Sequence, residues 1–197
     1  NNSSIQNNTA TIDGGGIDFS PFTGTKNLII NNTSVSGNVT GDQAIDRGYG
    51  GGILVNSSYA IAQLDTVSIT GNSAGESGGG IYVRNGSITT DNVDLDGNAA
   101  LGSDSGGGGM YILSGSFSVT AGSFDLGSAV SGAGGFESFN SGGFVDGTTF
   151  TSNQVSGPGT SFDQGGGAIA IVGISAATAP AVTIRNISET NNTAALE

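Results

Sequence analysis

A cluster of glycines followed by an apolar residue recurs along the chain, and this repeat constrains the fold more than any other feature. A second signal, an apolar residue followed three positions later by asparagine, precedes most of the clusters. Successive units are roughly 30 residues long, which is the length of one structural repeat. The apolar residues after the glycines are Ile17, Ile53, Ile81, Met110, Phe136 and Ile169, and the asparagines are Asn8, Asn38, Asn72, Asn98 and Asn153. The fifth unit departs from the pattern, with Leu126-Gly127-Ser128 in place of an asparagine.

Between these two signals, apolar and polar residues alternate with a period of two, which indicates short, half-buried strands. One unit supplies three such strands, at Ile81-Tyr82-Val83, Ser87-Ile88-Thr89 and Val93-Asp94-Leu95-Asp96. One unit cannot bury its apolar residues alone, whereas stacked units can. The sequence therefore predicts an all-β, right-handed parallel β-helix with three faces and about six to seven coils. We expect residues 1–195 to be a single domain excised from a longer array, and residues 196–197 to be a cloning remnant.

The two repeated signals are expected to form corners of the coil. Glycine permits a positive φ and a close approach between neighbouring backbones. The repeated asparagine can bond the same side chain of the next coil, so we expect Asn8, Asn38, Asn72, Asn98 and Asn153 to form a structural ladder. The segment between asparagine and glycine varies most in length, which places the insertions at one corner.

These residues resemble a known family. Phe150-Thr151-Ser152-Asn153 and Gly166-Gly167-Ala168-Ile169 are similar to the F-x-x-N and G-G-A-I halves of the repeat of chlamydial-type polymorphic outer-membrane proteins. The other copies replace Phe by Ile, Val or Leu, and Ala by Gly. The resemblance implies an autotransporter-like passenger that is exported and takes part in adhesion. This chain lacks cysteine and shows no C-terminal membrane barrel, which are departures from the family.

Composition excludes several classes of function. The net charge of −12, with 16 acidic and four basic residues, argues against nucleic acid and anionic membranes. Histidine and cysteine are absent, so sites that depend on them cannot exist. The glycine clusters lack the Gly-Lys-Ser/Thr of a phosphate loop, and no apolar run is long enough for a membrane helix.

Carboxylates offer two candidate sites. One acidic residue precedes most glycine clusters, and a vertical row of these could bind calcium. We favour the simpler interpretation that they point to solvent on loops of unequal length. This acidic row consists of Asp13, Asp46, Glu76, Asp104 and Asp163. The second group, Asp91, Asp94 and Asp96 with Asp65 and Asp125 in neighbouring coils, faces outward from a strand. Two outward carboxylates could hydrolyse a polysaccharide, or they could simply keep the surface soluble.

Tyr82 and Tyr111 occupy the middle of equivalent strands, so we expect them to stack on the outer surface with Leu54 next in line. They are candidates for contacts with sugar or protein, and cross-strand packing is the alternative.

We therefore expect an extracellular or cell-surface scaffold or adhesin segment that is not an enzyme. Its expected partner is a host or neighbouring cell-surface protein or glycan, with no cofactor except a possible calcium ion and no membrane insertion of this segment. Open sheet edges at the two ends also suggest end-to-end association. The alternatives are a polysaccharide-binding or polysaccharide-cleaving enzyme, and an ice- or surface-binding solenoid. A lyase would use Arg84 or Arg185 as its base.

Overall fold

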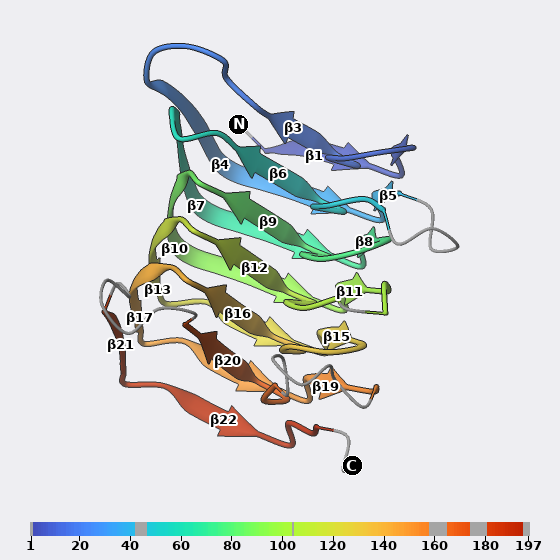
Figure 1. Cartoon of the computed structure of the whole chain (residues 1–197), viewed down its shortest axis with the longest axis vertical. Coiled ribbons are helices and arrows are strands. Elements are labelled where there is room, and N and C mark those ends of the chain that lie inside the picture. Colours follow the sequence, from blue (N-terminus) through green and yellow to red (C-terminus); the bar gives the residue numbers. More distant parts are fainter. Residues whose placement is uncertain (1, 42–46, 104, 158–164, 174–180, 195–197) are drawn as a thin grey trace.

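The chain folds into a parallel β-solenoid whose short strands stack along one axis (Figure 1). The computed structural model describes residues 2–41, 47–103, 105–157, 165–173 and 181–194. Within these residues the strands form three sheets, the paired strands are parallel, and no helix occurs. The predicted all-β solenoid with three faces is confirmed. The described part of the chain also contains no helix long and apolar enough to cross a membrane.

Each sheet gathers equivalent strands from successive coils. The longest sheet follows the order β1-β4-β7-β10-β13-β17-β21, with β14, β18 and β22 paired alongside. Its strands are β1 (Ser3–Gln6), β4 (Lys26–Ser36), β7 (Ala60–Thr70), β10 (Ser87–Asp96), β13 (Ser116–Thr120), β14 (Ser123–Asp125), β17 (Gly142–Asp146), β18 (Thr149–Thr151), β21 (Val182–Arg185) and β22 (Ser188–Thr190).

The other two sheets contain six strands each. The second sheet consists of β2 (Thr9–Ala10), β5 (Val39–Thr40), β8 (Ser73–Ala74), β11 (Ala99–Ala100), β15 (Ser128–Ala129) and β19 (Gln154–Val155). The third consists of β3 (Ile17–Phe19), β6 (Ile53–Asn56), β9 (Ile81–Arg84), β12 (Met110–Leu113), β16 (Phe136–Phe139) and β20 (Ile169–Val172).

The core consists of rows of apolar side chains that run along the axis. In the third sheet, the apolar residue after each glycine cluster pairs in register with its equivalent in the next coil, from Ile17 through Ile53, Ile81, Met110 and Phe136 to Ile169. Ile53, Ile81, Met110 and Phe136 are completely buried. Each such side chain contributes about 1.5–3 kcal/mol by leaving water, so the interior rows hold the coils together.

The strand boundaries differ from those expected in one respect. The sequence predicted separate strands around Ile88 and Leu95, but β10 runs through both and bends at Asn92, whose φ is 52°. Asn32 and Thr66 have positive φ at the equivalent points of β4 and β7. The bend therefore needs one residue in the left-handed region rather than a loop. The two-residue strands after each asparagine were not predicted, because two residues carry no periodicity.

The glycine clusters form a tight corner for two separate reasons. The first glycine has a positive φ, as at Gly50 (67°) and Gly78 (68°), a conformation that other residues adopt at a cost. The second glycine lies against the backbone of the next coil: a Cβ on Gly79 would come within 2.4 Å of the carbonyl oxygen of Ala99. Any side chain there would push two coils apart.

The asparagines form a buried ladder at the opposite end of the second sheet. The Nδ2 of Asn38 donates to the Oδ1 of Asn72 at 2.9 Å, and the Nδ2 of Asn72 donates to the Oδ1 of Asn98 at 3.0 Å. Asn8 begins the row by donating to Asn38. Gly127 interrupts the row because it has no side chain, and Asn153 resumes it by donating to Asn192. Each side-chain amide thus forms hydrogen bonds with the amide of the next coil, and these polar groups would otherwise lack partners at the corner.

Candidate functional site

Only two members of the predicted acidic row, Asp13 and Glu76, lie within the described residues. Asp46, Asp104 and Asp163 lie outside the described residues. Asp13 and Glu76 both bind Tyr49: the Oδ1 of Asp13 accepts a hydrogen bond from its backbone N–H at 3.0 Å, and the Oε1 of Glu76 accepts one from its hydroxyl at 2.6 Å. Among the residues that the structure describes, no group of three acidic side chains could hold a metal ion.

Three tyrosines stack on the outer side of the third sheet. Tyr82 and Tyr111 pair in register and their rings are nearly parallel, with centroids 5.4 Å apart. Tyr49 adds a tilted ring 4.5 Å from that of Tyr82. Leu54 continues the row in β6. Tyr49 lies in the corner loop before β6, whereas Tyr82 and Tyr111 lie in strands, so the stack combines one loop residue with two strand residues.

This tyrosine stack is more enclosed than a free outer surface. Tyr82 is 3% exposed, and Leu54 is 2% exposed. Burial raises the pKa of the Tyr49 hydroxyl, and its hydrogen bond to the Glu76 carboxylate raises that pKa further. Burial also raises the pKa of Tyr82, although the nearby Arg84 opposes this effect. With Tyr82 covered, the stack offers Tyr49 and Tyr111 as its partly exposed members.

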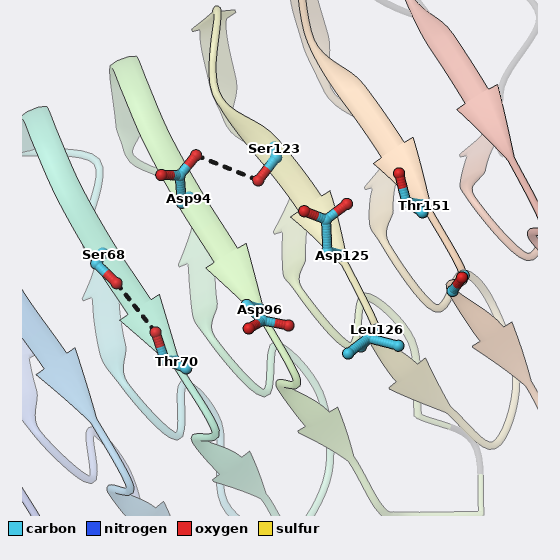
Figure 2. Close-up of a pocket in the computed structure, with 9 residues that line it drawn as sticks. Ser68, Thr70, Asp94, Asp96, Ser123, Asp125, Leu126 and Thr151 are labelled. Atoms are coloured by element: carbon cyan, nitrogen blue, oxygen red, sulfur yellow. Dashed lines mark hydrogen bonds between the residues drawn. The ribbon is translucent and has the colours of Figure 1, made fainter.

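The outward carboxylates of the longest sheet meet in a shallow hollow. The hollow lies over β7, β10, β14 and β18 (Figure 2). Its volume is about 610 Å³. Asp94, Asp96 and Asp125 line it, and the Ser123 hydroxyl donates to the Oδ1 of Asp94 at 3.2 Å. Its remaining lining residues are Ser68, Thr70, Leu126, Thr151 and Ser152. We call this surface the acidic hollow.

Register explains why the acidic hollow contains three carboxylates. Asp94 pairs with Ser123, and Asp96 pairs with Asp125. Side chains two positions apart on a strand share a face, so both pairs point outward. One oxygen of Asp125 is enclosed and has no hydrogen-bond partner in the described part of the chain. The arrangement places three carboxylates and several hydroxyls on one outward face of the sheet, where they can accept and donate hydrogen bonds.

Asp65 and Asp91 form a separate outward row on the same sheet. They pair with each other, and the row continues through Thr120 to Asp146. A hydrogen bond from Asn186 lowers the pKa of Asp146, and Arg185 lowers it further through a 3.0 Å ion pair. Arg185 is thus paired at this row rather than placed at the acidic hollow.

The other candidate base, Arg84, ends β9 in the third sheet, whereas the acidic hollow lies over the longest sheet. Neither arginine lines the hollow. The two arginines considered for a lyase are therefore not brought together with the three carboxylates.

Sequence reasoning missed Glu137, which takes the place of the next tyrosine. It pairs with Tyr111 in register and is completely buried. Its Oε2 accepts a hydrogen bond from the backbone N–H of Ala133 at 3.2 Å. Gly106 and Gly132 make room for the carboxylate, since a Cβ at either would lie within 2 Å of that oxygen. The sequence did hold a signal for this position: Glu137 directly follows Phe136, as Tyr82 follows Ile81 and Tyr111 follows Met110.

One coil carries both corner signals in their regular form. Ile69 and Asn72 are followed after a short connection by glycines 78–80 and Ile81. Residues 66–84 match the family model of the Chlamydia polymorphic membrane protein repeat. This match confirms the resemblance noted in the sequence, and it covers the part of the coil from the bend of β7 to the end of β9.

In this chain, the matched residues therefore comprise the second part of β7, the short strand β8, the strand β9 and the two corners between these strands. A search of the curated proteins and a search of the solved structures each found no match.

Proposed function

We propose that this chain is a non-enzymatic segment of a secreted or surface-exposed protein, in which the solenoid displays flat outer faces for adhesion. The match of residues 66–84 to the polymorphic membrane protein repeat carries this proposal. Parallel coils support it, because each sheet extends along the axis and places the outward residues of successive coils in rows. Contacts spread along a rod suit adhesion to an extended surface.

The acidic hollow is the face that we propose for contact with a glycan or a cell-surface protein. Its carboxylates and hydroxyls can accept and donate hydrogen bonds to sugar hydroxyls or to polar protein groups. Its shallow form favours an extended partner rather than an enclosed small molecule. The negative charge of the chain also favours a neutral or basic partner.

A pair of matched variants tests this face. Labelled protein is applied to a glycan array and to intact cells, and compared with Thr70→Lys and Gln63→Lys. Both changes add one lysine to β7, but Thr70 lines the acidic hollow and Gln63 does not. We expect T70K to lose at least tenfold in binding and Q63K to bind as the original chain does. Equal binding by both variants would show that the acidic hollow is not the face that binds the partner.

A polysaccharide-cleaving enzyme remains the second candidate, because Asp94, Asp96 and Asp125 share one hollow. Release of new reducing ends from a panel of polysaccharides tests it. Turnover that disappears in D94N or D125N would establish this activity and overturn the non-enzymatic proposal. On the adhesive interpretation, no reducing ends are released from any member of the panel.

A further inference from the structure

Leu126 occupies a corner position at which the neighbouring coils carry a small residue. The equivalent residues are Gly71 and Gly97 before it and Ser152 after it, and each donates its backbone N–H to the residue that precedes the equivalent position in the next coil. All four have a positive φ, between 52° and 61°. The corner therefore requires the left-handed conformation in every one of these coils.

Leucine suits this conformation poorly. The left-handed region brings the Cβ close to the following carbonyl oxygen, which glycine avoids and asparagine tolerates. Among the described non-glycine residues with a positive φ, Leu126 has the largest apolar side chain. That side chain is 60% exposed, so interior packing does not offset the strain. Strained residues that packing does not explain occur mainly at binding and active sites, so this combination points to a function.

Leu126 supplies the apolar part of the acidic hollow. Figure 2 shows it near Asp96 and Asp125, and the other lining residues end in hydroxyls or carboxylates. A Cβ on Gly97, at the same corner of the preceding coil, would meet no atom within 4 Å, so the space beside the leucine is open. A ligand can therefore contact the leucine and the carboxylates at the same time.

These groups together match one class of ligand. Ionised carboxylates only accept hydrogen bonds, so the ligand must supply donors. Their charge disfavours an anionic ligand, and none of the lining residues is basic. A neutral sugar ring meets both conditions, because its hydroxyls donate hydrogen bonds from its rim and its C–H groups form an apolar face.

We propose that Leu126 is a specificity-determining residue of the acidic hollow and that the ligand of the hollow is a neutral glycan. This inference rests on the adhesive role proposed above for the hollow. One sugar ring lies with its C–H face on Leu126 and donates its hydroxyls to the carboxylates of Asp96 and Asp125. The leucine selects the apolar face of the ring, and the carboxylates select against sialylated and sulfated glycans.

Two substitutions separate a role in binding from a role in folding. Leu126→Asn introduces the residue found at the equivalent Asn191, whose φ is 56°, and relieves the strain, so the urea midpoint of unfolding should rise. Binding to an array of neutral, sialylated and sulfated glycans should nevertheless fall by about tenfold. Leu126→Met keeps the apolar surface and should retain most of the binding. A residue with a purely structural role would change stability and binding in the same direction.

Asn191→Leu is the matched control, because it makes the reverse change at the same corner but outside the acidic hollow. It should bind the array as the original chain does. Loss of binding in N191L equal to that in L126N would show that the hollow is not the site of the effect and would overturn the proposal.

Four further results would each overturn it: an original chain that binds no neutral glycan or prefers anionic ones, L126N that binds like the original chain, a urea midpoint of L126N that does not rise, or equal loss of binding in L126M and L126N. The proposal for the hollow itself is tested separately by T70K. If T70K loses binding to cells while L126N keeps it, the hollow remains the contact face and the role of Leu126 is refuted.

Discussion

Asn72 shows how one buried polar residue serves three coils. Its Oδ1 accepts hydrogen bonds from the backbone N–H and the Nδ2 of Asn38, both at 2.9 Å. Its Nδ2 donates to the carbonyl of Val35 and to the Oδ1 of Asn98, both at 3.0 Å. The side chain is completely buried, so water cannot replace these partners. The requirement for asparagine follows from this need for two donors and one acceptor in a fixed plane.

Asn72→Ala should therefore destabilise the protein strongly. The change strands polar groups of Asn38, Val35 and Asn98 inside the corner, at a cost of about 3 kcal/mol. Urea unfolding followed by circular dichroism measures this loss. Asn31→Ala is the control, because the Asn31 side chain is exposed on β4 and the change should cost less than about 0.5 kcal/mol. A loss for N72A no larger than that for N31A would contradict the role of the ladder.

Tyr49 makes stability depend on pH in the alkaline range. Its folded-state pKa lies above the ordinary value of 10.0, so the unfolded chain releases this proton first as the pH rises. The stabilising contribution is complete below pH 10.0 and is lost as the pH rises toward the folded-state pKa. Tyr49→Phe should therefore reduce the loss of stability between neutral and strongly alkaline pH.

Denaturant unfolding at several alkaline pH values measures this effect, with Tyr59→Phe as the control because Tyr59 is exposed in a turn. Identical alkaline profiles for Y49F and the original chain would show that Tyr49 does not contribute.

Among the elements, the bent strands show a conflict between residue type and conformation. Asn32, Thr66 and Asn92 occupy equivalent bends of β4, β7 and β10, with φ between 48° and 54°. Asparagine adopts this left-handed region at little cost, whereas the branched Cβ of threonine makes it strained. The Thr66 side chain is exposed, so interior packing does not explain its presence.

Thr66→Asn should raise the free energy of unfolding by about 1 kcal/mol, because it relieves this strain. The reciprocal change Asn92→Thr at the next bend should lower it by a similar amount. Urea unfolding of the two single variants measures both, and changes of the same sign would show that the bend does not select the residue.

For the molecule as a whole, stability should vary along the axis. A solenoid is approximately one-dimensional, so a coil with two neighbours is more stable than a coil with one. The middle strands β7 and β10 have buried residues at alternate positions, whereas β22 is exposed throughout. Both ends therefore have fewer interior contacts to lose when they open.

Native-state hydrogen exchange should be slowest in β7, β9, β10 and β12 and faster in β1, β21 and β22, since end coils can open without the middle. Peptide-resolved mass spectrometry measures the protection of each strand. Uniform protection from β1 to β22 would mean that the solenoid opens as one cooperative unit.

Much of this architecture could be predicted from the repeat. Stacking of equivalent strands follows from units that cannot bury their apolar residues alone, and the recurrence of Ile53, Ile81 and Met110 predicts one interior row. The sequence also located the corners, because positive φ and close backbone approach favour glycine, as at Gly78 and Gly79. These are local requirements, so they leave a local signal in every unit.

The outer surfaces depended on tertiary structure. Tyr82 lies in the middle of a strand as expected, yet it is 3% exposed, and Tyr49 from a corner loop packs on its ring. Asp94, Asp96 and Asp125 form one hollow because register brings neighbouring coils together. The sequence by itself determined the coil, its corners and its interior rows, since each repeats. Tertiary structure alone decided which outward residues are covered by loop side chains and which lie together in a hollow. Both outcomes depend on contacts between coils, and the loops that connect these coils differ in length.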